Sequence, residues 1–84
     1  MIEGSYDNIE VTLKISLDDT DRVILRIFNS HPNHYFRLRE IKTILLYERI
    51  EISNSKLAKK LEFFSITALI NREKRGRFYS YIIC

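Results

Sequence analysis

The chain has 84 residues, which is enough for one small domain and too few to enclose a large substrate cavity. A hydrophobic fraction of 45% with two glycines and one proline excludes a disordered or low-complexity chain. Residues 1–21 carry six acids and one lysine, a net charge of −5, so the remaining residues carry +8 of the total charge of +3. So basic a segment favours a polyanionic partner, either nucleic acid or an anionic membrane surface.

Membrane-spanning, secreted and zinc-binding proteins are not the expected classes. No apolar run approaches the about 20 residues of a membrane span, and the N-terminal flank is acidic where that of a signal peptide is basic. We therefore expect an intracellular, cytoplasmic protein. Cys84 is the single cysteine, so neither an intrachain disulfide nor a thiolate zinc site is expected, and an interchain bridge is the one disulfide left open.

The first expected element is a strand. Apolar and polar residues alternate from Ile9 to Leu17, which is typical of a half-buried strand. Its edge needs a partner, and two are possible: the C-terminal sheet of the same chain or a second copy in a homodimer. The acids at 18, 19 and 21 then favour a helix start. That helix is expected to end near Asn29-Ser30, with an apolar stripe formed by Val23, Ile24, Ile27 and Phe28.

Two more helices are expected after the loop around Pro32. Tyr35-Phe36 is interpreted as a very short strand, followed by a helix from Leu38 to Arg49. A third helix over residues 53–65 has either Ser53 or Ser55 as its cap. The apolar spacing predicts two buried stripes, formed by Leu38, Ile41, Ile44 and Leu45 and by Leu57, Leu61 and Phe64.

The end of the chain is typical of a hairpin. Two β-branched and aromatic runs, residues 68–73 and 77–83, flank Lys74-Arg75-Gly76 as the expected turn. The whole order predicts an α+β fold, a winged helix-turn-helix of three helices plus a C-terminal β-hairpin wing, with an extra N-terminal strand. We expect one domain over residues 1–84, which divides into an arm (1–17), two helices (18–52), a recognition helix (53–65) and the wing (66–84).

The stretch LAKKLEFFSITALINREKRGRFYSYII, which starts at Leu57, resembles the winged-helix segment of MarR-like and ArsR-like transcription regulators. The entry Arg39-Glu40-Ile41 is also similar to the start of their helix-turn-helix, and the resemblance covers about residues 20–83. Small winged-helix proteins of archaeal viruses and plasmids are similar in size. The positions that carry the resemblance are Leu57, Leu61, Phe64, Ala68-Leu69-Ile70, Arg72, Gly76-Arg77 and Tyr81.

This resemblance implies sequence-specific binding of double-stranded DNA and regulation of transcription. The sequence departs from the family pattern in two places. Ala68 replaces the usual glycine, so a turn without a positive φ is expected there. The interval from Ile41 to Leu57 is longer than the usual tight turn, so we expect either a longer second helix or a bulged loop.

DNA contacts are expected on the third helix and on the wing. Asn54 can pair bidentately with adenine and Ser55 can contact base edges or phosphate, the alternative for both being helix capping alone. The basic side chains are expected to bind phosphates or an A·T-rich minor groove, although a lysine-rich helix face taken alone is typical of a solvated surface.

Seven cations are expected to face the DNA, namely Lys56, Lys59, Lys60, Arg72, Lys74, Arg75 and Arg77. If about six of these seven side chains touched phosphates, a plot of log affinity against log salt concentration would have a slope of about −5.

No catalytic residue, cofactor, metal or small-molecule effector is expected. The chain has no serine, histidine and acid set and no glycine-rich phosphate loop, and His31 and His34 have no third donor nearby. A homodimer on two half-sites about one helical turn apart would give so small a protein specificity. Two rivals are a winged-helix module that binds protein instead of DNA and a binder of RNA or anionic lipid. Against RNA, the sequence shows no aromatic stacking platform.

Overall fold

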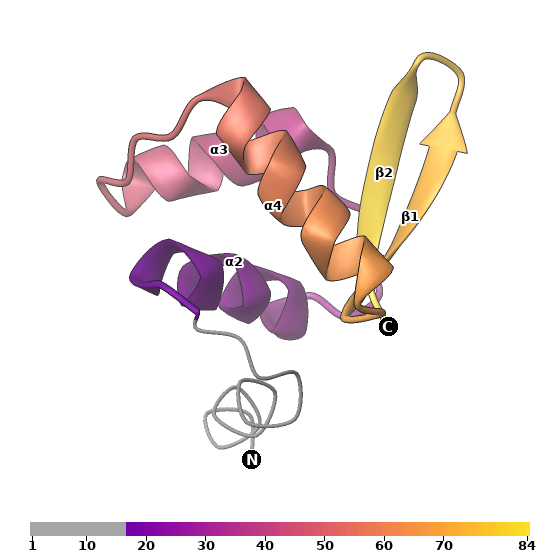
Figure 1. Cartoon of the computed structure of the whole chain (residues 1–84), viewed down its shortest axis with the longest axis horizontal. Coiled ribbons are helices and arrows are strands. Elements are labelled where there is room, and N and C mark those ends of the chain that lie inside the picture. Colours follow the sequence, from indigo (N-terminus) through magenta and orange to yellow (C-terminus); the bar gives the residue numbers. More distant parts are fainter. Residues whose placement is uncertain (1–16) are drawn as a thin grey trace.

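A computed structural model of the chain describes residues 17–84. Over this range three helices, α2, α3 and α4, are followed by an antiparallel hairpin of strands β1 and β2, which stands beside α4 (Figure 1). This is the expected winged-helix-like order. The expected arm with its strand from Ile9 lies outside the described residues, except for Leu17, which is buried in the core.

Helix α2 spans Asp19–Ser30 and begins as its acids predict. The Asp18 carboxylate accepts the backbone N–H of Asp21 at 2.7 Å, and the Asp21 carboxylate accepts that of Asp18 at 3.1 Å. These reciprocal bonds satisfy two of the backbone donors that a helix start leaves unpaired. The helix buries Ile24, Ile27 and Phe28 of the predicted stripe together with Leu25, while Val23, the fourth predicted residue, is half-buried.

Helix α3 spans Leu38–Tyr47 and ends before the predicted Arg49. Its start is fixed by the Glu40 carboxylate, which accepts the backbone N–H of Arg37 at 2.9 Å. Immediately before it, Phe36 forms the expected short strand pairing, because its backbone exchanges hydrogen bonds of 2.7 and 2.8 Å with Tyr81 of the hairpin. The start of α3 is therefore tied to the wing.

Helix α4 spans Asn54–Ile66, and the loop of residues 48–53 precedes it. The long interval of the helix-turn-helix is thus taken up by the loop and not by a longer α3. Leu57, Leu61 and Phe64 form the predicted buried stripe of α4, each at most 1% exposed.

Strands β1 (Ile70–Arg75) and β2 (Phe78–Ile83) form the wing, with Arg75 opposite Phe78. The turn is therefore Gly76-Arg77, and the predicted turn at 74–76 is wrong because Lys74 and Arg75 lie in β1. Gly76 has φ +63°, a conformation that glycine adopts without steric cost. Side chains alternate between the two faces of the hairpin, so Ile70 and Tyr81 reach the core while most of β1 stays exposed.

The core lies where the three helices meet the base of the hairpin. It contains residues from every described element and from the short bridge before α3, so the hairpin is packed onto the helices rather than standing free. Its buried members are Leu17, Ile24, Leu25, Ile27, Phe28, Phe36, Ile41, Leu45, Leu57, Leu61, Phe64, Ile70 and Tyr81.

Helix α4 ends on a non-glycine residue in the left-handed conformation. Ala68 has φ +63°, its N–H donates to the carbonyl of Ser65 at 3.2 Å, and the N–H of Leu69 donates to the carbonyl of Phe64 at 2.9 Å. The expectation of a turn without a positive φ at Ala68 is wrong. This pair of hydrogen bonds closes a helix only when the first residue after the C-cap, here Ala68, is in the left-handed conformation. Arg49, at φ +61°, ends α3 with the equivalent pair of bonds.

Replacing Ala68 by glycine should raise the free energy of unfolding. The left-handed conformation costs alanine about 1–2 kcal/mol, and the freedom that glycine adds to the unfolded chain offsets about 0.4–1 kcal/mol of the gain. We therefore expect a net stabilisation of about 0.5–1 kcal/mol in urea denaturation. The matched control is Ala58→Gly inside α4, which should lose about 1 kcal/mol. An Ala68→Gly protein that is less stable than the wild type would contradict this account.

Candidate nucleic-acid interface

The first turn of α4 is polar and exposed. The Ser53 hydroxyl accepts the backbone N–H of Lys56 at 3.2 Å, so Ser53 is the cap and Ser55 is not. The Ser55 hydroxyl lies 3.4 Å from that of Ser53 and is exposed. No acid occupies this first turn, so the positive end of the helix dipole is open to an anion.

Asn54, the first residue of α4, links this helix to α3. Its amide oxygen accepts a hydrogen bond of 2.7 Å from the Lys42 ammonium, while the side chain itself is exposed. The link holds the amide in one orientation and brings a lysine next to it. Sequence reasoning left Lys42 out of the candidate site, because its relation to Asn54 depends on how α3 and α4 pack.

The three lysines of α4 differ in their surroundings. Lys56 and Lys59 are exposed, but the Lys60 ammonium is half-buried and lies 2.8 Å from Asp21 and 3.0 Å from Asp18. Lys60 therefore fastens α4 to the start of α2. Its contact with DNA stays a prediction, and the two ion pairs oppose it.

These ion pairs shift two pKa values. Burial alone would raise the pKa of Asp18, but the hydrogen bond from the Asp21 backbone and the Lys60 ammonium outweigh it, so the pKa lies below 3.8. Burial would lower the pKa of Lys60, but its two carboxylate partners hold it above 10.5. Both shifts mean that the folded state favours the charged forms.

The wing carries four basic side chains in two kinds of environment. The Arg72 guanidinium lies 4.5 Å from the centre of the Tyr79 ring and 3.9 Å from Glu62. That of Arg75 lies 4.2 Å from the Tyr35 ring and 3.4 Å from Glu73. The other two, Lys74 and Arg77, have no ion pair with any residue in 17–84.

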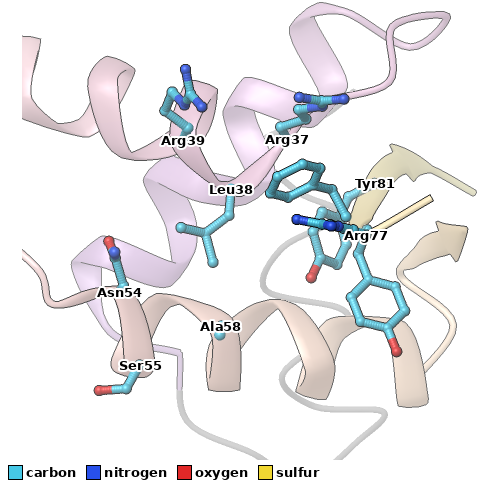
Figure 2. Close-up of a pocket in the computed structure, with 10 residues that line it drawn as sticks. Arg37, Leu38, Arg39, Asn54, Ser55, Ala58, Arg77 and Tyr81 are labelled. Atoms are coloured by element: carbon cyan, nitrogen blue, oxygen red, sulfur yellow. The ribbon is translucent and has the colours of Figure 1, made fainter. Parts of the chain in front are cut away.

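A groove of about 470 Å³ lies between the starts of α3 and α4 and the tip of the wing (Figure 2). Leu38 projects from α3 toward α4, Ala58 lies on the facing side of α4, Arg37 lies just before α3, and Arg77 lies at the turn of the wing. We call this hollow the arginine-rimmed groove. It is lined by Arg37, Leu38, Arg39, Asn54, Ser55, Ala58, Arg77, Phe78, Tyr79 and Tyr81.

The groove unites some of the predicted site residues and adds others. Asn54, Ser55 and Arg77 line it, but Arg37 and Arg39 were missed as site residues although they line it too. The sequence did contain a signal for these two arginines. The first helix of a helix-turn-helix crosses the DNA backbone, and Arg37-Leu38-Arg39 stands where that helix begins. Of the ten lining residues, three are arginines and none is acidic.

Two solved structures share this fold. The ferric uptake regulator from Pseudomonas aeruginosa with manganese matches with a TM-score of 0.79 at 14% sequence identity, covering 99% of this chain and 60% of that chain. The ferric uptake regulator from Francisella tularensis with iron matches with a TM-score of 0.75 at 16% identity, covering 82% and 53%. At these identities the likeness shows the fold alone.

The winged-helix expectation is thus confirmed at the level of the fold, through proteins other than the MarR-like and ArsR-like regulators that the sequence resembles. Both proteins are named as regulators and not as enzymes, and the chain spans between half and two-thirds of their length. No protein-family model matches the chain, and no curated protein matches it.

The manganese and the iron are named for those two solved structures and not for this chain. In residues 17–84 no group of three His, Cys, Asp or Glu side chains is placed to hold a metal ion. His34 lies 3.4 Å from Glu40, and the rings of His31 and His34 pack edge-on against Phe36. In the same range no helix is long and apolar enough to cross a membrane.

The contact between Lys60 and the start of α2 should make stability depend on acidic pH. Because the folded-state pKa of Asp18 is lowered, its contribution is complete above pH 3.8 and is lost as pH falls through the folded value. Lys60→Met should lower the free energy of unfolding at neutral pH and reduce its acid dependence, measured by urea denaturation from about pH 2 to pH 7. Lys59→Met, which removes an exposed charge one residue away, is the control and should change neither quantity. Equal acid dependence in both variants would contradict this role of Lys60.

Proposed function

We propose that the chain binds double-stranded DNA sequence-specifically and regulates transcription, with α4 in the major groove and the wing on the adjacent backbone or minor groove. The observation that carries this proposal is the arginine-rimmed groove, where Arg37 before α3, Arg39 of α3 and Arg77 of the wing line one hollow with the polar start of α4, and no acidic residue is part of the lining. A duplex is the polyanion whose curvature and spacing suit a projecting helix flanked by cations.

The start of α4 supports the reading of bases. In a helix-turn-helix the N-terminal residues of the second helix contact base edges, and here these are the exposed Asn54 and Ser55. The Lys42 ammonium occupies one lone pair of the Asn54 amide oxygen, and the other lone pair and the amide N–H groups are those that a bidentate pair with adenine would use. We propose Asn54 as the main base-reading residue, with Ser55 on a base edge or a phosphate.

The cations around α4 support phosphate binding. Lys56 and Lys59 lie exposed on α4, and Lys74 and Arg77 lie exposed on the wing. Arg72 and Arg75 are also proposed to bind phosphate, with guanidinium groups that stacking on tyrosine rings holds in place. Of the seven predicted cations, the proposal rests least on Lys60, whose ammonium is already paired.

We also propose that the protein acts as a homodimer on two half-sites about one helical turn apart. So few base-reading side chains in one chain give limited specificity, and a second copy would double them. Both structures that share the fold are named as regulators, which agrees with this function.

Arg39→Ala and Arg77→Ala should each weaken binding to every duplex. Fluorescence anisotropy with a random duplex at several salt concentrations should give a slope of about −5 for the wild type, and each variant should flatten it by about 1 because one phosphate contact is lost. The matched control is Arg26→Ala, which removes an equal charge from the exposed surface of α2. Absence of saturable, salt-dependent binding would overturn the proposal in favour of a protein-binding module. The stoichiometry of the same titration tests the dimer.

Asn54→Ala should reduce specificity more than affinity. After selection of a cognate site, loss of one bidentate base contact should cost about 1–3 kcal/mol at that site and leave random duplex nearly unaffected. Competition between cognate and random duplexes measures the difference. An equal loss on both would show that Asn54 serves the helix and not the bases; Ser55→Ala, at the next exposed position, is the comparison variant.

A further inference from the structure

The arginine-rimmed groove has an aromatic wall that intact duplex cannot use. Phe78 and Tyr79 line it and are 52% and 43% exposed. Exposed rings of this size on so small a domain mark a binding surface. In a duplex the faces of the bases are stacked on one another, so a paired base offers these rings only its edge. The wall therefore fits a ligand with a free planar face.

Both rings already take part in stacks with guanidinium groups. Arg37 lies 4.8 Å from the centre of the Phe78 ring, and Arg72 lies 4.5 Å from that of Tyr79. Unpaired bases stack on aromatic rings and on arginine planes alike, so a base can extend either stack. The sequence alone showed no aromatic stacking platform, because the two rings meet their arginines only in the folded chain. Phe78 and Tyr79 are consecutive in β2, so their rings project from opposite faces of the hairpin, and Phe78 is the ring that the Arg37 guanidinium meets at the start of α3.

The rim supplies the charge that a nucleotide needs. Arg37, Arg39 and Arg77 enter the lining from two elements, and none of the ten lining residues is acidic. Arginine matches a phosphate group with paired N–H donors. Leu38 and Ala58 make the space between the rims apolar, which suits the flat faces of a base.

Size and polar groups agree with a single nucleotide. The volume of about 470 Å³ lies within the range of about 300–1,000 Å³ that is usual for small-ligand pockets. At the α4 end, Asn54 places an amide beside the lining, where it can hydrogen-bond the edge of a base, while the Ser55 hydroxyl points away from the groove (Figure 2).

We propose that the arginine-rimmed groove binds one unpaired nucleotide, with its base against Phe78 and its phosphate on Arg37, Arg39 and Arg77. The nucleotide comes either from an unpaired position in the bound DNA or from solution as a free nucleotide. Only the first source rests on the proposed function. The chain would then distinguish opened or overhanging DNA from fully paired DNA.

The test compares three labelled DNAs by fluorescence anisotropy with the full chain: a blunt duplex, the same duplex with a short adenine overhang, and the same overhang made of abasic residues. The abasic strand has equal phosphate charge and no bases, so the ratio of the last two affinities isolates stacking. We expect the adenine overhang to bind roughly tenfold more tightly than the abasic one. Free adenosine monophosphate is added as competitor to identify the source.

Phe78→Leu should bring the ratio of adenine to abasic affinity close to one, because leucine keeps the apolar volume without a flat ring. Tyr47→Leu is the matched control, since Tyr47 is 85% exposed on α3 and does not line the groove; it should keep the wild-type ratio. Circular dichroism checks that both variants fold.

The outcomes separate the two proposals. A wild-type ratio near one, without competition by adenosine monophosphate, overturns the nucleotide site even if the blunt duplex binds. An adenine preference that Phe78→Leu abolishes supports the site with DNA as its source. Competition by adenosine monophosphate that the same variant abolishes supports a free nucleotide, and it does so even if the blunt duplex does not bind and the proposed function fails.

Discussion

Every part of the candidate interface is held in place through the buried face of α4. Leu57, Leu61 and Phe64 are almost completely excluded from solvent, and they set the helix against α2, α3 and the base of the hairpin at once. Burial of three large apolar side chains supplies a free energy of about 1.5–3 kcal/mol each, which is large beside the net stability of a small domain. The opposite face of the same helix is consequently free to carry polar groups.

The three helices and the cap of α2 were predictable because the signals are local. Apolar spacing gave the stripes of α2 and α4, and the acids before α2 gave its capping pattern. The turn of the wing was misplaced because the pairing of β1 with β2, and not the position of Gly76 alone, decides which residues stay unpaired. The left-handed Ala68 was missed because alanine gives no local sign of that conformation, which the hydrogen bonds at the end of α4 impose.

The candidate site was only half predictable for a related reason. Asn54, Ser55 and Arg77 could be chosen by type and by position in the expected fold, but the groove also needs Arg37, Arg39 and Phe78 from segments far apart in sequence. Lys60 shows the opposite case. It has the same chemistry as Lys59 and lies next to it, yet one rotation step along the helix turns it from solvent to the two carboxylates of α2. The charge of each lysine can be read from the sequence, but whether the ammonium group lies in solvent or in an ion pair depends on tertiary packing.

The hydrogen-bonded end of α4 has a consequence for the proposed complex with DNA. Because Ala68 and Leu69 are bonded back to the last turn of the helix and Ile70 enters the core directly afterward, no slack chain separates α4 from β1. The backbone bridge at Phe36 fastens β2 to the start of α3 in the same way. These bonds hold helix and wing at one spacing and angle. In the proposed complex the cost of adjustment would fall on the nucleic acid, whose local groove width and stiffness would then contribute to selectivity at base pairs that no side chain touches.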